Sequence, residues 1–530
     1  MAYLGEPLRF LDPDDMARIH RAALRILDET GMWIDHDPSL EYLQTAGCRV
    51  DHDARRATFP PDVVDAAVAR MRQAYAQPDR LPARMAVRYS HVRFRSEPYR
   101  IHPDFTVSTG GFCCFVVDSE GRRRRATIED VRASLRLADA LPNIDLTGLP
   151  VSAQEVPQHE RPVRMAAELV KTTHKLGGIE TFCAHDAAYI TRIAEVVAGS
   201  AEQLRREPVL VGYGEARSPL CLDRNMAEIF ITYIKAGLPQ TLDTMVDGGA
   251  TAPMTPAACL AVGMAETLSA VVLAYAVDPD AVVGVDIIPS MMDMSSGIFR
   301  YAGPERWPLL GARLQLQQEF YGCPAGVHGG KTDACVPGVQ VGVEKAASMI
   351  MPVLCGAVGI GTVGHLENAV TFSPVQLVID DAIVAYVRRA IQGFDVNDET
   401  LAIETIHQVG PGGEFLTHPS TAAWCRTASL LHPLFERAPW DTIHGGDLVG
   451  MEEQARAQAE HLMAQPTQSP LTSDQEAAID EIVEEAVRKH PLAPSGRDVA
   501  LERSACPVLT RHTRGSDTAG RDGGGSSAAR

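Results

Sequence analysis

The sequence is poor in aromatic residues and in basic charge, and it lacks the short motifs of nucleotide-binding folds. Aromatic residues make up 6% of the 530 residues, and the formal net charge is -19. Such a chain would repel a phosphate backbone or an anionic membrane surface, so nucleic acid and membranes are excluded as expected partners. No strand-to-helix junction reads Gly-x-Gly-x-x-Gly, the fingerprint of the doubly wound dinucleotide-binding fold.

Signals for export, membrane insertion and disulfides are also missing. No uncharged apolar run of about 18 residues is bounded like a membrane span, and the start, MAYLGEPLRFLDPDD, lacks a basic region before an apolar core. The 11 cysteines follow no disulfide framework and include no Cys-x-x-Cys pair. We therefore predict a cytoplasmic protein with reduced cysteines.

The segment Gly330-Lys331-Thr332 looks at first like the end of a phosphate-binding loop. A P-loop reads Gly-x-x-x-x-Gly-Lys-Ser/Thr. Here the position of the first glycine is occupied by Ala325. A loop that began at Gly326 instead would be one residue too short. The nucleotide interpretation is rejected, and the segment needs another explanation.

What the sequence does contain is a repeated strand and helix pattern between two helical flanks. Residues 1–100 are predicted to form a helical N-terminal segment, with helices at 12–31, 36–47 and 60–73. From 101 to 395, short apolar runs alternate about eight times with amphipathic runs. The expected strands are at 112–118, 144–151, 175–182, 208–214, 240–246, 281–288, 323–329 and 354–363.

Eight βα units predict a TIM (β/α)8 barrel, with a doubly wound sheet as the alternative. After the barrel, residues 396–490 are predicted to form a helical extension. Residues 491–530 are rich in glycine, serine and arginine and have almost no large apolar side chains. They are predicted to be a disordered tail.

In a TIM barrel the reacting groups lie on the loops that follow the strands. Carboxylates and aromatic faces together suit an organic cation, which aromatic rings hold by their negative faces. The simpler alternative is that the glycine pairs of these loops form tight turns, that Glu215 pairs with Arg217, and that the aromatic side chains only pack. The loops carry Glu215, Asp247, His328, Asp333, His365 and Glu367 as ionisable groups, and Phe112, Tyr213 and Tyr301 among the aromatic ones.

Metal binding is a competing interpretation of the same loops. His328, Asp333 and His365 are its candidate ligands, and they would serve a metal-assisted lyase or hydrolase. Cys323 and His328 would lie at opposite ends of one strand, too far apart for one ion at about 3.3 Å per residue. No Gly-x-Ser-x-Gly elbow indicates a serine nucleophile.

Taken in order, several longer motifs resemble those of the trimethylamine methyltransferase (MttB-like) family. The resemblance extends over roughly residues 10–465. The motifs are MARIHRAALRILDETGMWIDHDPSLEYLQTAGCRVD, ATIEDVRASLRLADALPNID, GGATAPMT, AGPE, GGKTDACVPGVQVG and VGPGGEFLTHPST.

The resemblance implies a barrel enzyme that moves a methyl group from a methylated amine to the cobalt of a corrinoid carried by a partner protein. The founding members contain pyrrolysine, whereas this chain contains only the twenty ordinary residues. It therefore resembles the non-pyrrolysine branch, which acts on quaternary amines such as glycine betaine. A non-catalytic betaine-binding protein is a further alternative. We expect a homo-oligomer without a tightly bound metal.

The resemblance to the family also implies roles for individual residues. The position of pyrrolysine is expected close to Gly329 or Gly330. Cys335 and Gly338 depart from the family pattern of Thr-Asp-Ala-Lys followed by Pro-Asp, which puts the substrate in question. Asp333, His328 and His365 are predicted to be catalytic, and the predicted substrate-binding residues are Phe112, Tyr213, Glu215, Asp247, Tyr301, Gly329, Gly330, Lys331 and Glu367.

Overall fold

The computed structural model describes residues 5–77, 99–437, 439 and 450–491, except for residues 103, 119, 211–213 and 467 within these ranges. The described residues up to His490 form one compact unit. The predicted tail lies outside the described residues, apart from Pro491. The predicted boundaries at residues 100 and 395 stay predictions.

The N-terminal helices form where the sequence predicts them. Asp12 caps the first helix by accepting a hydrogen bond from the Asp15 N–H, at 2.8 Å. Gly31 ends the helical run with a φ of 72°, a value that favours glycine. The elements are α1 (Pro13–Arg25), a π-helical turn (Ile26–Thr30), β1 (Met32–Ile34), α2 (Asp37–Thr45), β2 (Arg49–Asp51), β3 (Arg56–Thr58) and α3 (Pro61–Ala76).

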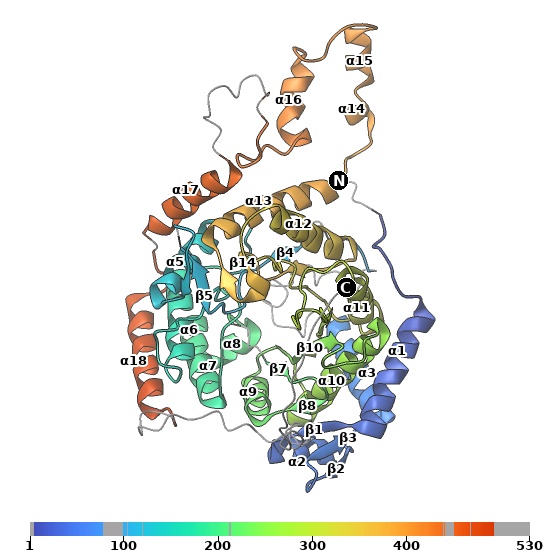
Figure 1. Cartoon of the computed structure of the whole chain (residues 1–530), viewed down its shortest axis with the longest axis vertical. Coiled ribbons are helices and arrows are strands. Elements are labelled where there is room, and N and C mark those ends of the chain that lie inside the picture. Colours follow the sequence, from blue (N-terminus) through green and yellow to red (C-terminus); the bar gives the residue numbers. More distant parts are fainter. Residues whose placement is uncertain are drawn as a thin grey trace, which may run out of the picture. The chain divides into compact units, whose positions relative to one another are not determined.

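Short parallel strands occupy the centre of the unit, and helices surround them (Figure 1). Single parallel bridges extend the pairing from Ser108 to Leu146, from Thr147 to Leu176 and from Val327 to Ile360. The paired strands are β4 (Thr106–Val107) with β13 (Gly359–Ile360), β10 (Asp243–Gly248) with β7 (Glu215–Ala216) and β12 (Ile288–Met291), and β9 (Gln240–Thr241) with β11 (Val283–Gly284).

The order of these pairs follows the predicted repeats, and the eighth repeat pairs back onto the first through β13 and β4. In the described residues no strand pair joins the third repeat to the fourth or the sixth to the seventh. Part of the fourth repeat, 211–213, lies outside the described residues. The fold is therefore α/β with parallel central strands, and the strand pairs among the described residues do not form one continuous ring.

The first predicted run does contain a strand, but its predicted place among the central strands is wrong. The run at 112–118 contributes β5 (Phe115–Val117) to a separate sheet, where it pairs with β6 (Arg123–Arg125) and β15 (Thr371–Phe372), and β15 also pairs with β14 (His365–Leu366). The central strand is β4, which lies earlier in the chain. A strand of only two residues, such as β4, is too short to show an alternation of polar and apolar side chains. The apolar run at 112–118 therefore looked more like a strand in the sequence.

The predicted helices of the repeats are confirmed. Their starts are local, as in α5, where Thr127 and Asp130 form a reciprocal capping box. One short helix, α8 (Ala201–Arg206), was not predicted. The others are α5 (Ile128–Ala140), α6 (Arg161–Thr172), α7 (Ala184–Ala198), α9 (Arg224–Lys235), α10 (Pro256–Val277), α11 (Arg306–Gln315), α12 (Val339–Leu354) and α13 (Pro374–Ile391).

One helix among the described residues, α10, is long and apolar enough to cross a membrane by length and composition. Its apolar window is 83% buried inside the structure. The N-terminal helices α1, α2 and α3 pack against it. The cytoplasmic location predicted from the sequence stays a prediction.

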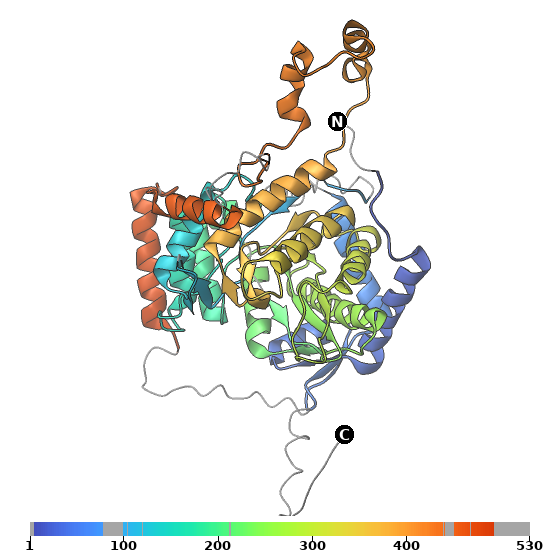
Figure 2. The same cartoon turned by 45° about the horizontal axis from the view of Figure 1, so that its top comes forward.

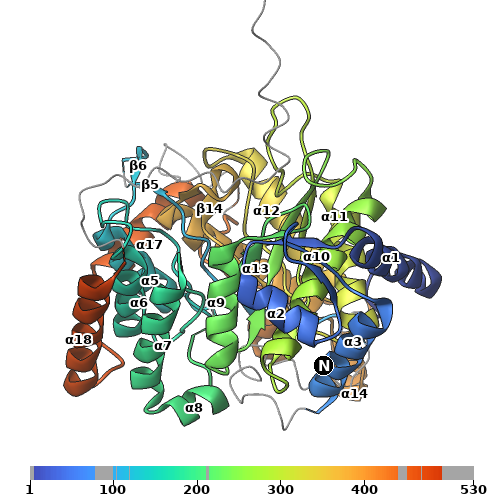
Figure 3. The ribbon, with the colours of Figure 1, turned by 90° about the horizontal axis from the view of Figure 1, so that it is seen from below.

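The C-terminal helices α17 (Met451–Ala464) and α18 (Ser473–Lys489) cover the outer helices (Figure 2). α17 packs on α13 and α5, and α18 packs on α6 and α7, as the view from below also shows (Figure 3). Both helices lie in the predicted helical extension, 396–490. Between α13 and α17 the described chain forms α14 (Asp398–Leu401), α15 (Ile403–Val409) and α16 (Pro419–Ala428), which have no buried residue.

Candidate functional site

A pocket of about 490 Å³ lies beside strands β7 and β10. Its wall combines aromatic rings, acidic groups and one arginine, Arg217. Of the predicted site residues, Phe112 and Glu215 line it. The complete lining is Phe112, Glu180, Thr181, Phe182, Glu215, Ala216, Arg217, Ser218, Met226 and Met245. Glu180 was not predicted; its carboxylate accepts a hydrogen bond from Ser152 Oγ at 2.9 Å, and burial raises its pKa to about 7.

Beside this pocket a buried tyrosine is flanked by two cations. The hydroxyl of Tyr301 lies 3.7 Å from the sulfur of Met245, which lines the pocket. Lys331 Nζ lies 3.9 Å from the centre of the Tyr301 ring, and Arg306 Cζ lies 5.2 Å from it. Burial, followed by the charge of Arg306, lowers the pKa of Lys331 to about 7. Lys331 therefore carries only part of a positive charge at neutral pH.

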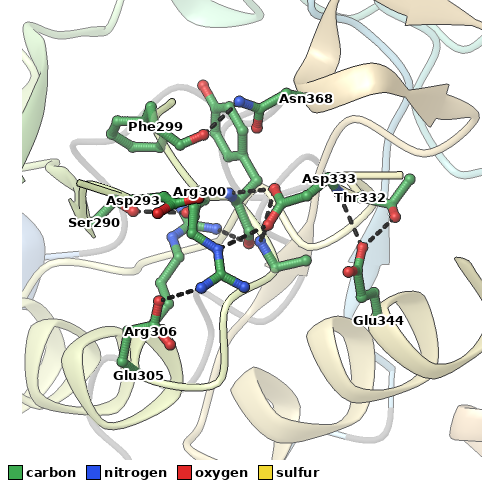
Figure 4. A network of polar contacts seen from close by, with 12 residues as sticks. Ser290, Asp293, Phe299, Arg300, Glu305, Arg306, Thr332, Asp333, Glu344 and Asn368 are labelled. Carbon is green, nitrogen blue, oxygen red and sulfur yellow. Dashed lines mark hydrogen bonds and ion pairs between the residues drawn. The ribbon is translucent and has the colours of Figure 1, made fainter. Parts of the chain in front are cut away.

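Asp333 lies beside Arg300 in a polar network (Figure 4) and holds the loop that carries Tyr301. Its Oδ1 accepts hydrogen bonds from the backbone N–H groups of Tyr301 at 2.8 Å and Ala302 at 3.3 Å. Arg300 lies at 3.5 Å on the other carboxylate oxygen. On the opposite side the backbone N–H of Asp333 donates to Glu344 of α12 at 2.9 Å. The carboxylate thus ties the loop after β12 to the loop before α12, and its predicted catalytic role stays a prediction.

Arginine 306 was not predicted as a site residue, yet it is one of the largest buried side chains. Its guanidinium donates to the carbonyl groups of Tyr301 at 2.7 Å and Pro289 at 3.0 Å. Burial lowers its pKa to about 10. The sequence shows it only as the first residue of an amphipathic helix, and no local pattern marks a buried cation.

The glycine pair Gly329-Gly330 packs tightly against its surroundings. A Cβ atom on Gly329 would lie 2.5 Å from the carbonyl oxygen of Ser348, and one on Gly330 would lie 2.4 Å from the backbone of Val363. Side chains of α12 bind the pair from below, because Ser348 Oγ donates to Gly329 O at 2.6 Å and Lys345 Nζ donates to Gly330 O at 2.7 Å. The close approach explains both glycines by packing, and their predicted contact with substrate stays a prediction.

We expect Gly330→Ala to lower the free energy of unfolding by about 1 to 3 kcal/mol, since its new methyl group would displace the backbone of Val363. Gly342→Ala is the matched control. Gly342 is exposed within α12, with nothing within 4 Å of an added Cβ, so alanine should raise helix stability by up to about 1 kcal/mol. Urea denaturation of both variants measures the difference, and equal stabilities would contradict the packing role.

The two predicted catalytic histidines are buried close to cationic side chains. His365 Nε2 lies 2.5 Å from the carbonyl oxygen of Gly110 and therefore carries the proton. The Nδ1 atoms of His365 and His328 are buried and have no hydrogen-bond partner. Burial, followed by the charge of Lys331, lowers the pKa of both imidazoles well below the usual value. Burial thus favours the neutral form of both rings, and in His365, whose Nε2 carries the proton, Nδ1 is left as an acceptor without a donor.

The remaining predicted residues lie in different settings. Asp247 is 5% exposed, its Oδ1 atom has no hydrogen-bond partner, and burial raises its pKa to about 6. Glu367 forms an ion pair with Arg123 at 2.5 Å. Tyr213 lies outside the described residues. In the described part of the chain, the one cluster whose ligand atoms are close enough to share a metal ion does not include His328, Asp333 or His365.

Comparison with known proteins identifies the family. A model of the trimethylamine methyltransferase (MTTB) family matches residues 5–491. The chain belongs to this family. The family expected from the motifs is therefore confirmed.

Individual relatives within the trimethylamine methyltransferase family include archaeal and bacterial proteins. The chain is 32% identical over 295 residues to trimethylamine methyltransferase MttB of Methanosarcina thermophila. This match covers 55% of this chain and 61% of that protein. It is 28% identical over 332 residues to a glycine betaine methyltransferase of Desulfitobacterium hafniense, and this match covers 62% of this chain and 69% of that protein. The matches thus span about 60% of the first relatives' length.

Among solved structures, the monomethylamine methyltransferase MtmB of Methanosarcina barkeri matches with 13% identity and a TM-score of 0.39. The match covers 87% of this chain and 95% of that chain.

Proposed function

We propose that the protein transfers a methyl group from a quaternary methylamine of the betaine type to the cobalt(I) of a corrinoid carried by a separate protein. The pocket beside β7 and β10 carries this proposal, because it combines groups for both ends of a betaine. Phe112, Phe182 and Glu215 suit the quaternary ammonium, and Arg217 suits the carboxylate. Membership of the trimethylamine methyltransferase family supports the reaction class.

The residues of the pocket bind and orient the substrate. The aromatic faces and the carboxylate of Glu215 hold the trimethylammonium group, and each good cation–π contact contributes about 0.5 to 2 kcal/mol. The guanidinium of Arg217 fixes the other end of the molecule. With both ends fixed, one methyl carbon points along a single direction, which displacement at carbon requires.

The leaving group explains why no acid or base is needed beside the methyl carbon. A quaternary nitrogen leaves as a neutral tertiary amine, so no proton has to be supplied. The corrinoid supplies a strong nucleophile that accepts the methyl group. Tyr301, held by Asp333 and flanked by Lys331, closes the side of the pocket next to Met245.

Access for the partner comes from the loops after β10 and β12. Met254, Met294 and Ile298 are 50%, 65% and 48% exposed on these loops. A Cβ on Gly249 would lie 2.8 Å from the sulfur of Met254 and 3.1 Å from that of Met294, so the two methionines are neighbours. Flexible methionines suit a transient protein contact. We also propose that the central strands close into a TIM barrel that opens toward these loops.

A methyl-transfer assay tests the proposed function. Purified protein is mixed anaerobically with free cob(I)alamin and one of glycine betaine, carnitine or a choline-like amine, and the visible spectrum reports methylcobalamin. We expect one quaternary amine to react and trimethylamine to remain unchanged. Binding of a betaine without methyl transfer to cob(I)alamin or to a corrinoid protein would favour a non-catalytic binding protein instead.

Asp247 should make substrate affinity depend on pH. Burial raises the pKa of its carboxyl to about 6, so the group is anionic above pH 6 and neutral below it. If its charge contributes to binding the ammonium group, affinity for the substrate falls as pH drops through 6, by up to about tenfold per pH unit.

Calorimetric titration of the reactive amine from pH 5 to pH 8 measures this dependence. The Asp247→Asn variant should bind the amine weakly, and its affinity should no longer fall as the pH drops through 6. Glu305→Gln is the control, because Glu305 pairs with Arg300 on a neighbouring loop and its side chain is 40% exposed. If the affinity of Asp247→Asn still falls at acid pH, another group is responsible for the pH dependence.

A further inference from the structure

A cysteine, an aspartate and a histidine meet where α7 begins and α18 ends, behind the wall of the pocket. Cys183 is the residue before α7, Asp186 lies in its first turn, and His490 follows α18. Cys183 Sγ lies 3.6 Å from His490 Nε2 and 3.4 Å from Asp186 Oδ2, and His490 Nε2 lies 3.6 Å from Asp186 Oδ1. One ligand atom from each residue lies within 4.8 Å of the other two.

These separations match the ligand shell of a tetrahedral zinc ion. Zinc binds thiolate sulfur at about 2.3 Å and imidazole nitrogen or carboxylate oxygen at about 2.0 Å. Ligand atoms at tetrahedral angles around such an ion lie about 3.3 to 3.6 Å apart. Cys183 Sγ and His490 Nε2 are therefore spaced like two corners of the tetrahedron. The carboxylate of Asp186 lies at the same spacing from each of them, through Oδ2 to the sulfur and through Oδ1 to the nitrogen.

The aspartate lacks the partner that its burial demands. Asp186 is 1% exposed, and its Oδ1 atom has no hydrogen-bond partner. Its other oxygen accepts the backbone N–H of Phe182 at 3.2 Å. A buried carboxylate oxygen without a hydrogen-bond donor destabilises the folded state. A cation between Asp186, Cys183 and His490 would remove this cost.

Two further imidazoles lie beside the cluster. The ring centres of His159 and His185 lie 5.7 and 4.8 Å from that of His490. Imidazole nitrogen is a common zinc ligand, so these rings add donor groups next to Cys183, Asp186 and His490.

We propose that Cys183, Asp186 and His490 bind a structural zinc ion, with the fourth position open to water or to His159. The ion fastens the end of α18 to the start of α7 and holds the loop of Phe182, which lines the substrate pocket. This site differs from the metal ligands considered in the sequence analysis, and it departs from the expectation of no tightly bound metal. It does not depend on the proposed methyl transfer.

Metal analysis of the full chain tests the proposal. Protein is stripped with a chelator, incubated with excess Zn²⁺, desalted and measured by mass spectrometry. We expect about one zinc per chain in the wild type, less than a tenth of this in Cys183→Ser and His490→Gln, and about one in Cys425→Ser, which removes an exposed cysteine of α16. No zinc in the wild type, or equal zinc in all four proteins, overturns the proposal.

Cobalt(II) substitution provides a second measurement, and its deciding result comes from the wild-type protein. Co²⁺ added to the stripped wild type should give a thiolate-to-metal charge-transfer band and the visible absorption of a tetrahedral site. Cys425→Ser should keep both bands, and a folded Cys183→Ser should lose the first. A wild-type spectrum without a thiolate band overturns the assignment of Cys183, even if an ion binds.

Discussion

Lys345→Met lowers the free energy of unfolding by about 3 to 5 kcal/mol, the range for breaking a buried ion pair by removing one partner. Lys345 Nζ lies 2.5 Å from Asp380 Oδ2, and both side chains are completely buried. Without the ammonium group, the charge of Asp380 would be left unpaired. The same nitrogen donates to Gly330 O, so the loop of Lys331 would lose its support as well.

Chemical denaturation with two spectroscopic probes measures the loss. Lys489→Met is the matched control, because Lys489 also pairs with a carboxylate, Glu485 at 2.6 Å, but its side chain is 59% exposed. Water screens an exposed pair, so removing one partner changes the free energy of unfolding little. Equal losses in the two variants would show that the Lys345 pair does not support the fold as proposed. Asp380→Asn should recover part of the loss in a double variant, since it removes the unpaired charge.

Asp333→Ala reduces the rate of methyl transfer by about 100-fold or more while the fold stays intact. The carboxylate of Asp333 holds the N–H groups of Tyr301 and Ala302. Its loss frees the loop that places Tyr301 against Met245, and a displacement of about 1 Å near a reacting group costs about 100-fold in rate. Circular dichroism confirms the fold, and methylcobalamin formation gives the rate.

Two further variants separate the possible roles of Asp333. Asp333→Asn keeps an oxygen that accepts both N–H groups but loses the charge. A rate within about tenfold of wild type would assign Asp333 to positioning, and a loss as large as in Asp333→Ala would assign it to charge. Asp293→Ala is the control, because Asp293 accepts bonds from Ser295 and Ser296 in an exposed turn. An unchanged rate in Asp333→Ala would contradict both roles.

The site was predictable from sequence only in part. Phe112 and Glu215 were placed on the loops after strands, and both line the pocket. Glu180 and Arg306 were missed, because each looks locally like an ordinary polar residue of a helix or loop. Their burial and contacts arise from neighbours far along the chain, as the hydrogen bond from Arg306 to Pro289 shows.

The sequence by itself determined the helices, the α/β class and the family. Helix periodicity and caps such as Asp12 and Thr127 act over a few residues, so they can be recognised without knowing the fold. Only the tertiary structure decided that β4, and not the run at 112–118, pairs at the centre. It also decided that Lys345 meets Asp380 and that His490 meets Cys183, because packing alone brings together side chains so distant in sequence.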